Sequence, residues 1–143
     1  MSELYQKIPG IYMREEQKPF NLIEGVYREP ELELLKDIEW TFTEKVDGTN
    51  IRIVWDGHNV VFGGRTENAQ IPSHLVTKLN ELFMGTRMEQ VFEQVFGGSK
   101  AILFGEGYGA KIQKGGGDYS ETQKFVLFDV KVEEWYLRRE DVE

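Results

Sequence analysis

The sequence predicts an α+β fold in which antiparallel sheets are flanked by helices. Two Asp-Gly pairs, Asp47-Gly48 and Asp56-Gly57, separate runs rich in β-branched and aromatic residues, and such pairs are typical of tight hairpin turns. Further along, apolar residues recur at helical spacing in two neighbouring segments. With 143 residues and 40% apolar content, we expect a single domain over residues 1–143 with one core.

The first 39 residues contain no chemical motif, and we expect one short helix there, at 31–37. Strands are predicted at 40–46 and 49–55, with Asp-Gly as the two-residue turn between them. Lys45 then lies where the first strand meets its turn. The second Asp-Gly turn leads to a strand at 60–62, which completes an antiparallel meander.

Two amphipathic helices are expected after this meander. The first begins at Pro72 or Ser73, and the second spans 87–96. Their apolar residues recur every three or four positions, which indicates faces packed on the core rather than a cofactor site. These residues are Leu75, Leu79, Leu82 and Phe83 in the first helix and Met88, Val91, Phe92 and Val95 in the second.

A glycine-rich segment, 105–109, follows an apolar strand expected at 101–104. Glu106 lies at this junction, so we expect its carboxylate at a strand end with space around it. The glycine spacing partly resembles a dinucleotide-binding fingerprint. However, the βαβ unit that such a site requires is missing from the sequence, which excludes a Rossmann fold.

The last expected strand spans 125–132, and its alternation places Val126, Phe128 and Val130 on one face. Phe128 either packs in the core between these valines or offers a flat surface on which a purine can stack. Phe125 is a second candidate for the stacking role.

The segment EKVDGTN, residues 44–50, combines a lysine amine with a turn. An ordinary lysine has a pKa of about 10.4 and is an ammonium ion at neutral pH, so its use as a nucleophile requires surroundings that favour the neutral amine. On these residues alone, Lys45 is also compatible with a solvated lysine beside a hairpin.

The composition indicates a cytoplasmic protein without a membrane segment. The chain has no cysteine, which fits a reducing compartment, and it has neither a signal peptide nor a run of about 18 apolar residues. The two histidines, His58 and His74, are too far apart for a local metal motif. We therefore predict no metal-ligating residue.

The net charge of −8 disfavours general affinity for nucleic acid, because binding to RNA rests on lysine and arginine neutralising phosphates. Lys111 and Lys114 lie next to three consecutive glycines, 115–117. They form either a local patch for phosphates or an ordinary exposed loop.

Four sequence blocks occur in a characteristic order: EKVDGTNIRI from 44, GRTENAQIP from 64, LFGEGYG from 103 and KFVLFDVKV from 124. This order resembles the ATP-dependent RNA ligase family, more narrowly the branch that seals nicks in double-stranded RNA. The family is part of the covalent nucleotidyltransferases, with DNA ligases and mRNA capping enzymes. The resemblance implies an ATP-grasp-like adenylation domain that uses ATP and Mg²⁺ and joins RNA ends.

The same resemblance implies the roles of individual residues. Lys45 would attack the α-phosphate of ATP and form lysyl-AMP, the AMP would pass to an RNA 5′-phosphate, and an RNA 3′-hydroxyl would displace it. The nucleotide contacts implied by the family are Glu44 at the adenine edge, Asn50 and Arg65 at phosphate, Glu106 at the ribose hydroxyls and Phe128 stacked on adenine.

Members of this family carry two further blocks after the last strand, a glutamate that helps to hold metal and a strand with paired lysines. Residues 136–143 instead read as the charged beginning of a helix. We therefore expect an adenylation domain that is incomplete at its C-terminus, binds nucleotide better than it turns over, and self-associates through an exposed sheet edge. Two alternatives stay open: an mRNA capping-type guanylyltransferase, and a non-catalytic nucleotide- or RNA-binding remnant.

Overall fold

The structure, a computed structural model, describes residues 4–142, and the chain forms two compact units. The larger unit comprises Met1–Tyr5 and Lys45–Glu143, and the smaller unit is Gln6–Glu44. Each unit has its own antiparallel sheet, of five and of two strands, so the predicted α+β class is confirmed. None of the helices within residues 4–142 has the length and apolar character needed to cross a membrane.

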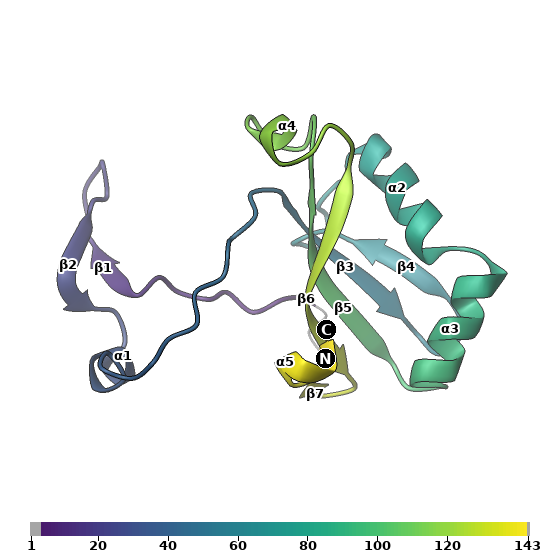
Figure 1. The fold of residues 1–143 in the computed structure, drawn as a ribbon, viewed down its shortest axis with the longest axis horizontal. Helices are drawn as coiled ribbons and strands as arrows, with labels where there is room; N and C mark the ends of the chain where they lie inside the picture. Colours follow the sequence, from purple (N-terminus) through teal and green to yellow (C-terminus); the bar gives the residue numbers. More distant parts are fainter. Residues whose placement is uncertain (1–3, 143) are drawn as a thin grey trace. The chain divides into compact units, whose positions relative to one another are not determined.

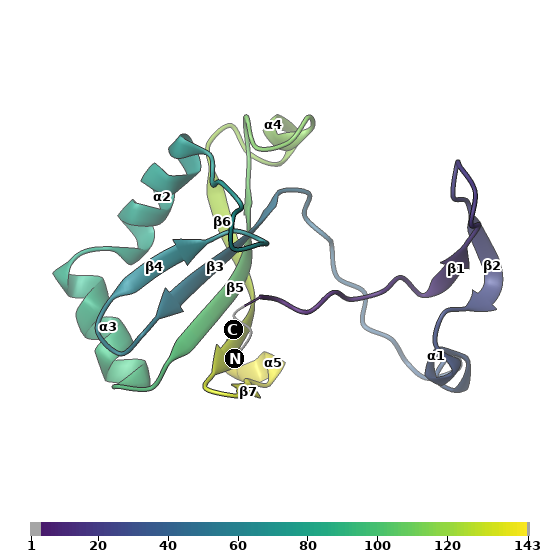
Figure 2. The same ribbon diagram turned by 180° about the vertical axis from the view of Figure 1, so that it is seen from behind.

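The sheet of the larger unit is antiparallel throughout, with the strand order β4-β3-β5-β6-β7 (Figures 1 and 2). Both predicted amphipathic helices are present, and a short helix lies in the segment expected to begin one at the C-terminus. The strands are β3 (Thr49–Trp55), β4 (Val60–Gly63), β5 (Ala101–Tyr108), β6 (Lys124–Val132) and β7 (Trp135–Tyr136). The helices are α2 (Ser73–Phe83), α3 (Thr86–Phe96), α4 (Gly116–Tyr119) and α5 (Arg139–Val142).

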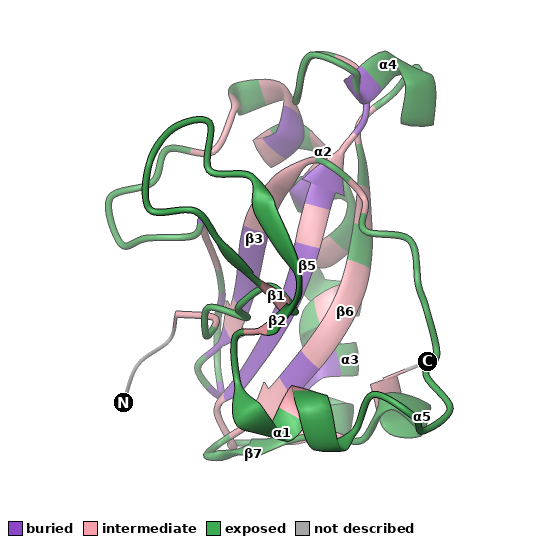
Figure 3. Cartoon of the chain, turned by 90° about the vertical axis from the view of Figure 1, so that its left-hand side faces the viewer, coloured by how far each residue is buried: buried purple, intermediate pink, exposed green. Residues whose placement is uncertain are grey.

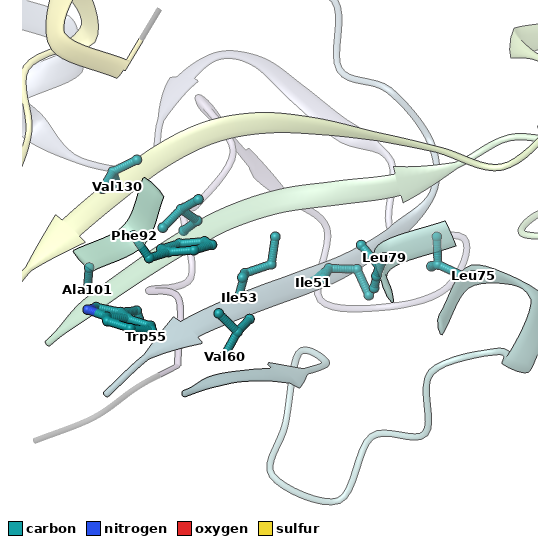
Figure 4. Packing of buried hydrophobic residues seen from close by; sticks show 10 residues of the cluster. Ile51, Ile53, Trp55, Val60, Leu75, Leu79, Phe92, Ala101 and Val130 are labelled. Atoms are coloured by element: carbon teal, nitrogen blue, oxygen red, sulfur yellow. The ribbon is translucent and has the colours of Figure 1, made fainter. Parts of the chain in front are cut away.

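Helices α2 and α3 cover one face of this sheet (Figure 1), and the core lies between them and the strands (Figure 4). Alternate residues of β3 point into it, as the period of a half-buried strand requires. Trp55 closes one end, because its ring stacks on Phe92 and its indole N–H donates to the carbonyl of Gly97 at 2.9 Å. The buried core residues are Ile51, Ile53, Trp55, Val60, Leu75, Leu79, Phe92, Ala101, Leu103 and Val130.

The turn between β3 and β4 confirms the hairpin predicted at the second Asp-Gly pair. The carboxylate of Asp56 accepts the backbone N–H groups of His58 at 2.8 Å and Asn59 at 2.7 Å. These hydrogen bonds lower the pKa of Asp56, with the one from Asn59 contributing most. The aspartate therefore stabilises the turn through its own side chain.

The strand predicted at 40–46 was wrong, and so was the hairpin turn at Asp47-Gly48. Strand β3 pairs with β5 from Thr49 to Trp55 and with β4 from Arg52 onwards, so its hydrogen-bonding edges serve these two strands. A methyl group at Gly48 would overlap with the carbonyl oxygen of Gly107. The glycine thus allows close approach to β5 instead of forming a hairpin.

The expectation that Glu106 ends a strand was also wrong. Strand β5 continues through the glycines to Tyr108, so Glu106 lies within it. Gly105 leaves room for the ring of Phe125, and Gly107 leaves room for Leu75 of α2. These glycines therefore serve close packing on the helix side of a strand, where the sequence suggested a loop.

The placement of Val130 on the same face as Val126 and Phe128 was wrong because β6 contains a bulge. Phe104 pairs with Asp129 and Gly105 pairs with Leu127, which leaves Phe128 as the extra residue. A bulge reverses the alternation of side chains beyond it. Val130 accordingly lies in the core, whereas Val126 is exposed.

The smaller unit contains β1 (Tyr12–Arg14), β2 (Leu22–Tyr27) and α1 (Pro30–Leu34). The helix predicted at 31–37 is present in shorter form. None of the residues from Gln6 to Glu44 is buried, and this unit is almost entirely green in Figure 3. Its strands were not predicted, because a strand without a buried face has no alternation between apolar and polar residues.

Candidate functional site

The face of the sheet opposite α2 and α3 carries the polar residues of the candidate site. Asn50 and Glu106 are direct partners in the pairing of β3 with β5. Their neighbours Ile51 and Gly107 face the core, Ile51 as a core residue and Gly107 by its contact with Leu75. Because side chains alternate along a strand, those of Asn50 and Glu106 lie on the face away from the helices. An amide and a carboxylate therefore meet at the end of the sheet where β3 begins.

Charged groups from two segments, the one that leads into β3 and the loop after β4, act on Glu106. Partial burial raises the pKa of its carboxyl above the ordinary value, and the nearby charge of Asp47 raises it further. The positive charges of Lys45 and Arg65 oppose this shift, as does the backbone N–H of Gly48, which donates to the carboxylate. A half-buried carboxylate that accepts a backbone N–H and is influenced by the charges of two cations is a favourable place for a polar ligand.

Lys45 lies in the segment that leads into β3, and its side chain is exposed. The peptide group of Gly48 is held on both sides, because its N–H donates to Glu106 and its carbonyl accepts the side-chain amide of Gln113 at 2.8 Å. Sequence analysis did not single out Gln113. The only sequence signal was its place between Lys111 and Lys114, for which a phosphate patch was one of two interpretations.

Asn50 is the second polar residue of the pair, and its amide oxygen is buried without a hydrogen-bond partner among the described residues. Such an atom is uncommon in folded proteins, because leaving a buried acceptor unpaired costs about 1–3 kcal/mol. A ligand that supplies a donor at this position would satisfy it.

Arg65 follows β4 in a loop, and its side chain is exposed. A second arginine, Arg52, supports this loop from β3: its Nε donates to the carbonyl of Gly64 at 2.9 Å and its Nη1 to the carboxylate of Glu67 at 3.2 Å. The side chain of Arg52 is only 4% exposed. Sequence analysis missed it, although a single arginine between Ile51 and Ile53 was a signal.

The two phenylalanine candidates are on different faces of the sheet. Phe125 packs edge-on against Phe83 of α2, on the helix side. Phe128 lies at the bulge with its ring 5.1 Å from that of Tyr5. Tyr5 also lies beside Phe104, whose side chain shares the face of Glu106. Of the two candidates, Phe128 is thus the one on the side of the candidate site.

Tyr5 binds the residue that follows Phe128, because its hydroxyl donates to the carboxylate of Asp129. Burial raises the pKa of the Tyr5 hydroxyl, and this hydrogen bond raises it further. Glu44, the remaining predicted contact, belongs to the smaller unit. The structure therefore gathers Lys45, Asn50 and Arg65 around Glu106, places Phe128 further along the same face, and assigns no position to Glu44 within the site.

The polar residues of the candidate site lie on the face of the sheet opposite α2 and α3. Two surface hollows occur elsewhere, one lined by residues 15–18 and one by side chains of α2 together with Thr122 and Gln123, and no predicted site residue lines either. Within residues 4–142 there is no group of three or more histidine, aspartate or glutamate side chains arranged to hold a metal ion.

The fold and the site define an α+β protein with a lysine, an arginine and a carboxylate gathered at one end of an antiparallel sheet. The family described as RNA ligase matches residues 38–143, a span that includes every predicted site residue. The chain belongs to the RNA ligase family. No curated protein matches it significantly.

Proposed function

We propose that this chain carries the adenylation site of an ATP-dependent RNA ligase, with Lys45 as the nucleophile. The observation that carries the proposal is that Asn50 directly opposes Glu106 in the sheet, where the half-buried carboxylate accepts the N–H of Gly48 and the charges of Lys45 and Arg65 lower its pKa against the effect of burial. A nucleophile, a phosphate-binding cation and an acceptor for sugar hydroxyls are thus together at one end of the sheet.

The first chemical step is the transfer of AMP to Lys45. The neutral Nζ attacks the α-phosphorus of ATP, an N–P bond forms, and the P–O bond to pyrophosphate breaks. The amine gives its proton to solvent and pyrophosphate leaves. The AMP then passes to an RNA 5′-phosphate, and an RNA 3′-hydroxyl displaces it as the new phosphodiester forms.

The other side chains bind and orient the nucleotide. The guanidinium of Arg65 offers parallel N–H donors to phosphate oxygens, and the carboxylate of Glu106 accepts hydrogen bonds from ribose hydroxyls. Asn50 adds an amide beside them. Phe128 offers a ring for stacking on adenine.

Magnesium enters this scheme as a partner of ATP. Mg²⁺ usually keeps several waters and is held by substrate phosphates with one or two protein carboxylates, so a dedicated protein cage is not required. Asp47, an exposed carboxylate whose charge acts on Glu106, fits this mode. The ion supplies charge neutralisation on the phosphates.

Intact-mass analysis after incubation with ATP and Mg²⁺ tests the proposal. The unchanged chain should gain an increment of the size of AMP, and Lys45→Ala should gain none. Lys78→Ala, which removes a lysine paired with Glu81 on α2, is the matched control and should behave like the unchanged chain. An increment that persists in Lys45→Ala would contradict the assignment of the nucleophile.

Two further arms separate the alternatives. An adduct formed from GTP in preference to ATP would favour a capping-type guanylyltransferase. ATP binding without any adduct would favour a nucleotide-binding protein that does not catalyse adenylation. For the nick-sealing branch, pre-adenylated protein should seal a nicked RNA duplex faster than it joins single strands, because that branch acts within a duplex.

RNA contact is proposed at the exposed lysines Lys111 and Lys114, near Gln113 and the Gly48 peptide that it holds. With a net charge of −8, local rather than overall charge must attract the phosphates. Replacing both lysines with glutamine should weaken RNA binding and flatten its dependence on salt, measured by fluorescence anisotropy. An unchanged salt dependence would contradict this placement.

A further inference from the structure

We infer that Arg52 is a positioning residue that holds the loop of Arg65 ready for phosphate. This inference rests on the proposed function and extends it to a side chain that does not itself touch the nucleotide.

The burial of Arg52 requires an explanation. Arg52 is 3% exposed, and most of the other residues of β3 are apolar. A buried guanidinium is costly unless it is paired and hydrogen-bonded, because its charge has left water. An apolar residue would fill this place at lower cost. We therefore look for the role of the charge in the groups that the guanidinium binds.

The partners of Arg52 lie on both sides of Arg65 in the sequence. Its Nε donates to the carbonyl of Gly64 at 2.9 Å, and its Nη1 donates to the carboxylate of Glu67 at 3.2 Å. After Arg65, the loop closes through a hydrogen bond from the N–H of Ala69 to the carbonyl of Thr66 at 3.2 Å. One buried side chain therefore binds the backbone just before Arg65 and a side chain of the turn that follows it.

The space around the guanidinium is shaped for it. Gly63 is the partner of Arg52 in the pairing of β3 with β4, and a methyl group at Gly63 would lie 2.7 Å from Nη2 of Arg52. The glycine thus lets the planar fork pass over the strand towards the loop. Lysine has no second branch and cannot reach both Gly64 and Glu67 with parallel donors.

The consequence concerns the charge of Arg65. Its side chain is exposed and long, so binding phosphate requires ordering of both the loop and the side chain, and that ordering opposes binding. By holding the loop, Arg52 removes the backbone part of this cost. The position so held is one from which the charge of Arg65 already acts on Glu106.

A mutant cycle tests the inference. ATP affinity is measured by equilibrium dialysis for the unchanged chain, Arg52→Met, Arg65→Ala and the double variant. Arg52→Met should weaken ATP binding about tenfold, the equivalent of a coupling of about 1.4 kcal/mol. The same change should have little effect once Arg65 is alanine, because Arg52 acts through Arg65. An equal loss in both backgrounds would overturn the inference.

Hydrogen exchange supplies a second readout that does not depend on nucleotide. Amides of residues 64–69 should exchange faster in Arg52→Met than in the unchanged chain, and Arg52→Lys should restore protection only in part. Arg138→Met removes an exposed arginine paired with Glu140 and should leave these amides unchanged. Unchanged exchange in Arg52→Met would overturn the inference.

If Arg52→Met does not fold, Glu67→Gln is the second variant. It should fold normally, because the Glu67 side chain is 68% exposed. It breaks the charged half of the anchor and should speed exchange over residues 66–69. If the proposed function is wrong, the unchanged chain itself should show neither an AMP adduct nor ATP binding. In that case exchange still decides whether Arg52 holds the loop.

Discussion

Asn50 and Glu106 face each other in direct register on neighbouring antiparallel strands, at the end of the sheet that the Lys45 segment enters. Directly opposed residues on one face have their Cβ atoms about 4.5–5.5 Å apart, so these two polar groups share one environment. Asn50 has a buried oxygen without a partner among residues 4–142, and Glu106 has a carboxyl whose pKa is raised. The sheet register thus creates the site.

The raised pKa of Glu106 predicts how stability depends on pH. The folded state binds this proton more tightly than the unfolded state, so the carboxyl contributes stability at pH values below its ordinary pKa of 4.5 and loses that contribution as pH rises through the raised value. Glu106→Gln has no such proton. As the pH rises from 4.5 through the raised pKa, the free energy of unfolding of the unchanged chain should therefore decrease relative to that of Glu106→Gln, as measured by urea denaturation. A constant difference at all pH values would contradict the prediction.

The neighbours of Glu106 should move its pKa in opposite directions. Lys45→Met removes a cation that lowers the pKa, so the pKa of Glu106 should rise. Asp47→Asn removes a like charge, so the pKa should fall. Carbon-13 NMR titration of the Glu106 carboxyl measures both shifts. Shifts of the same sign would show that these groups do not surround the carboxylate as described.

Gly107→Ala should destabilise the fold by packing a methyl group against α2. The added carbon would lie 2.5 Å from the side chain of Leu75, which is fully buried. Overpacking of this kind typically costs about 1–3 kcal/mol, because neighbouring side chains leave their preferred rotamers.

Gly117→Ala is the control for that change, since nothing lies within 4 Å of a methyl group there. Urea denaturation of both variants measures the difference. Equal stability of Gly107→Ala and Gly117→Ala would mean that α2 does not approach the strand at this point.

Gln113→Ala should loosen the segment that carries Lys45. The variant loses the donor to the carbonyl of Gly48, a single hydrogen bond that contributes about 0.5–1.5 kcal/mol, so ATP affinity and the rate of lysyl-AMP formation should fall about two- to tenfold. Gln94→Ala, on the exposed side of α3, is the matched control. A rate equal to that of the control would show that this hydrogen bond does not position the lysine.

Local features explain what the sequence predicted correctly. The hairpin at Asp56 depends on one side chain and its own backbone, and the apolar stripes around Leu79 and Phe92 follow from helical spacing. The four ordered blocks also indicated the RNA ligase family, which the match over residues 38–143 bears out. None of these features depends on which strand lies beside which.

Strand pairing decided the rest. Lys45 precedes β3 without a strand of its own, Glu106 lies within β5, and Phe128 is the extra residue of a bulge. Each position depends on partners far away in the sequence, which local spacing does not encode.

The sequence by itself determined the α+β class, the two helices, one hairpin and the family, because periodicity and turn chemistry act over a few residues. Only the tertiary structure decided that Arg52 lies beneath the loop of Arg65 and that Asn50 opposes Glu106. The physical reason is that hydrogen bonds between strands and the burial of charge are set by neighbours that the chain brings together on folding.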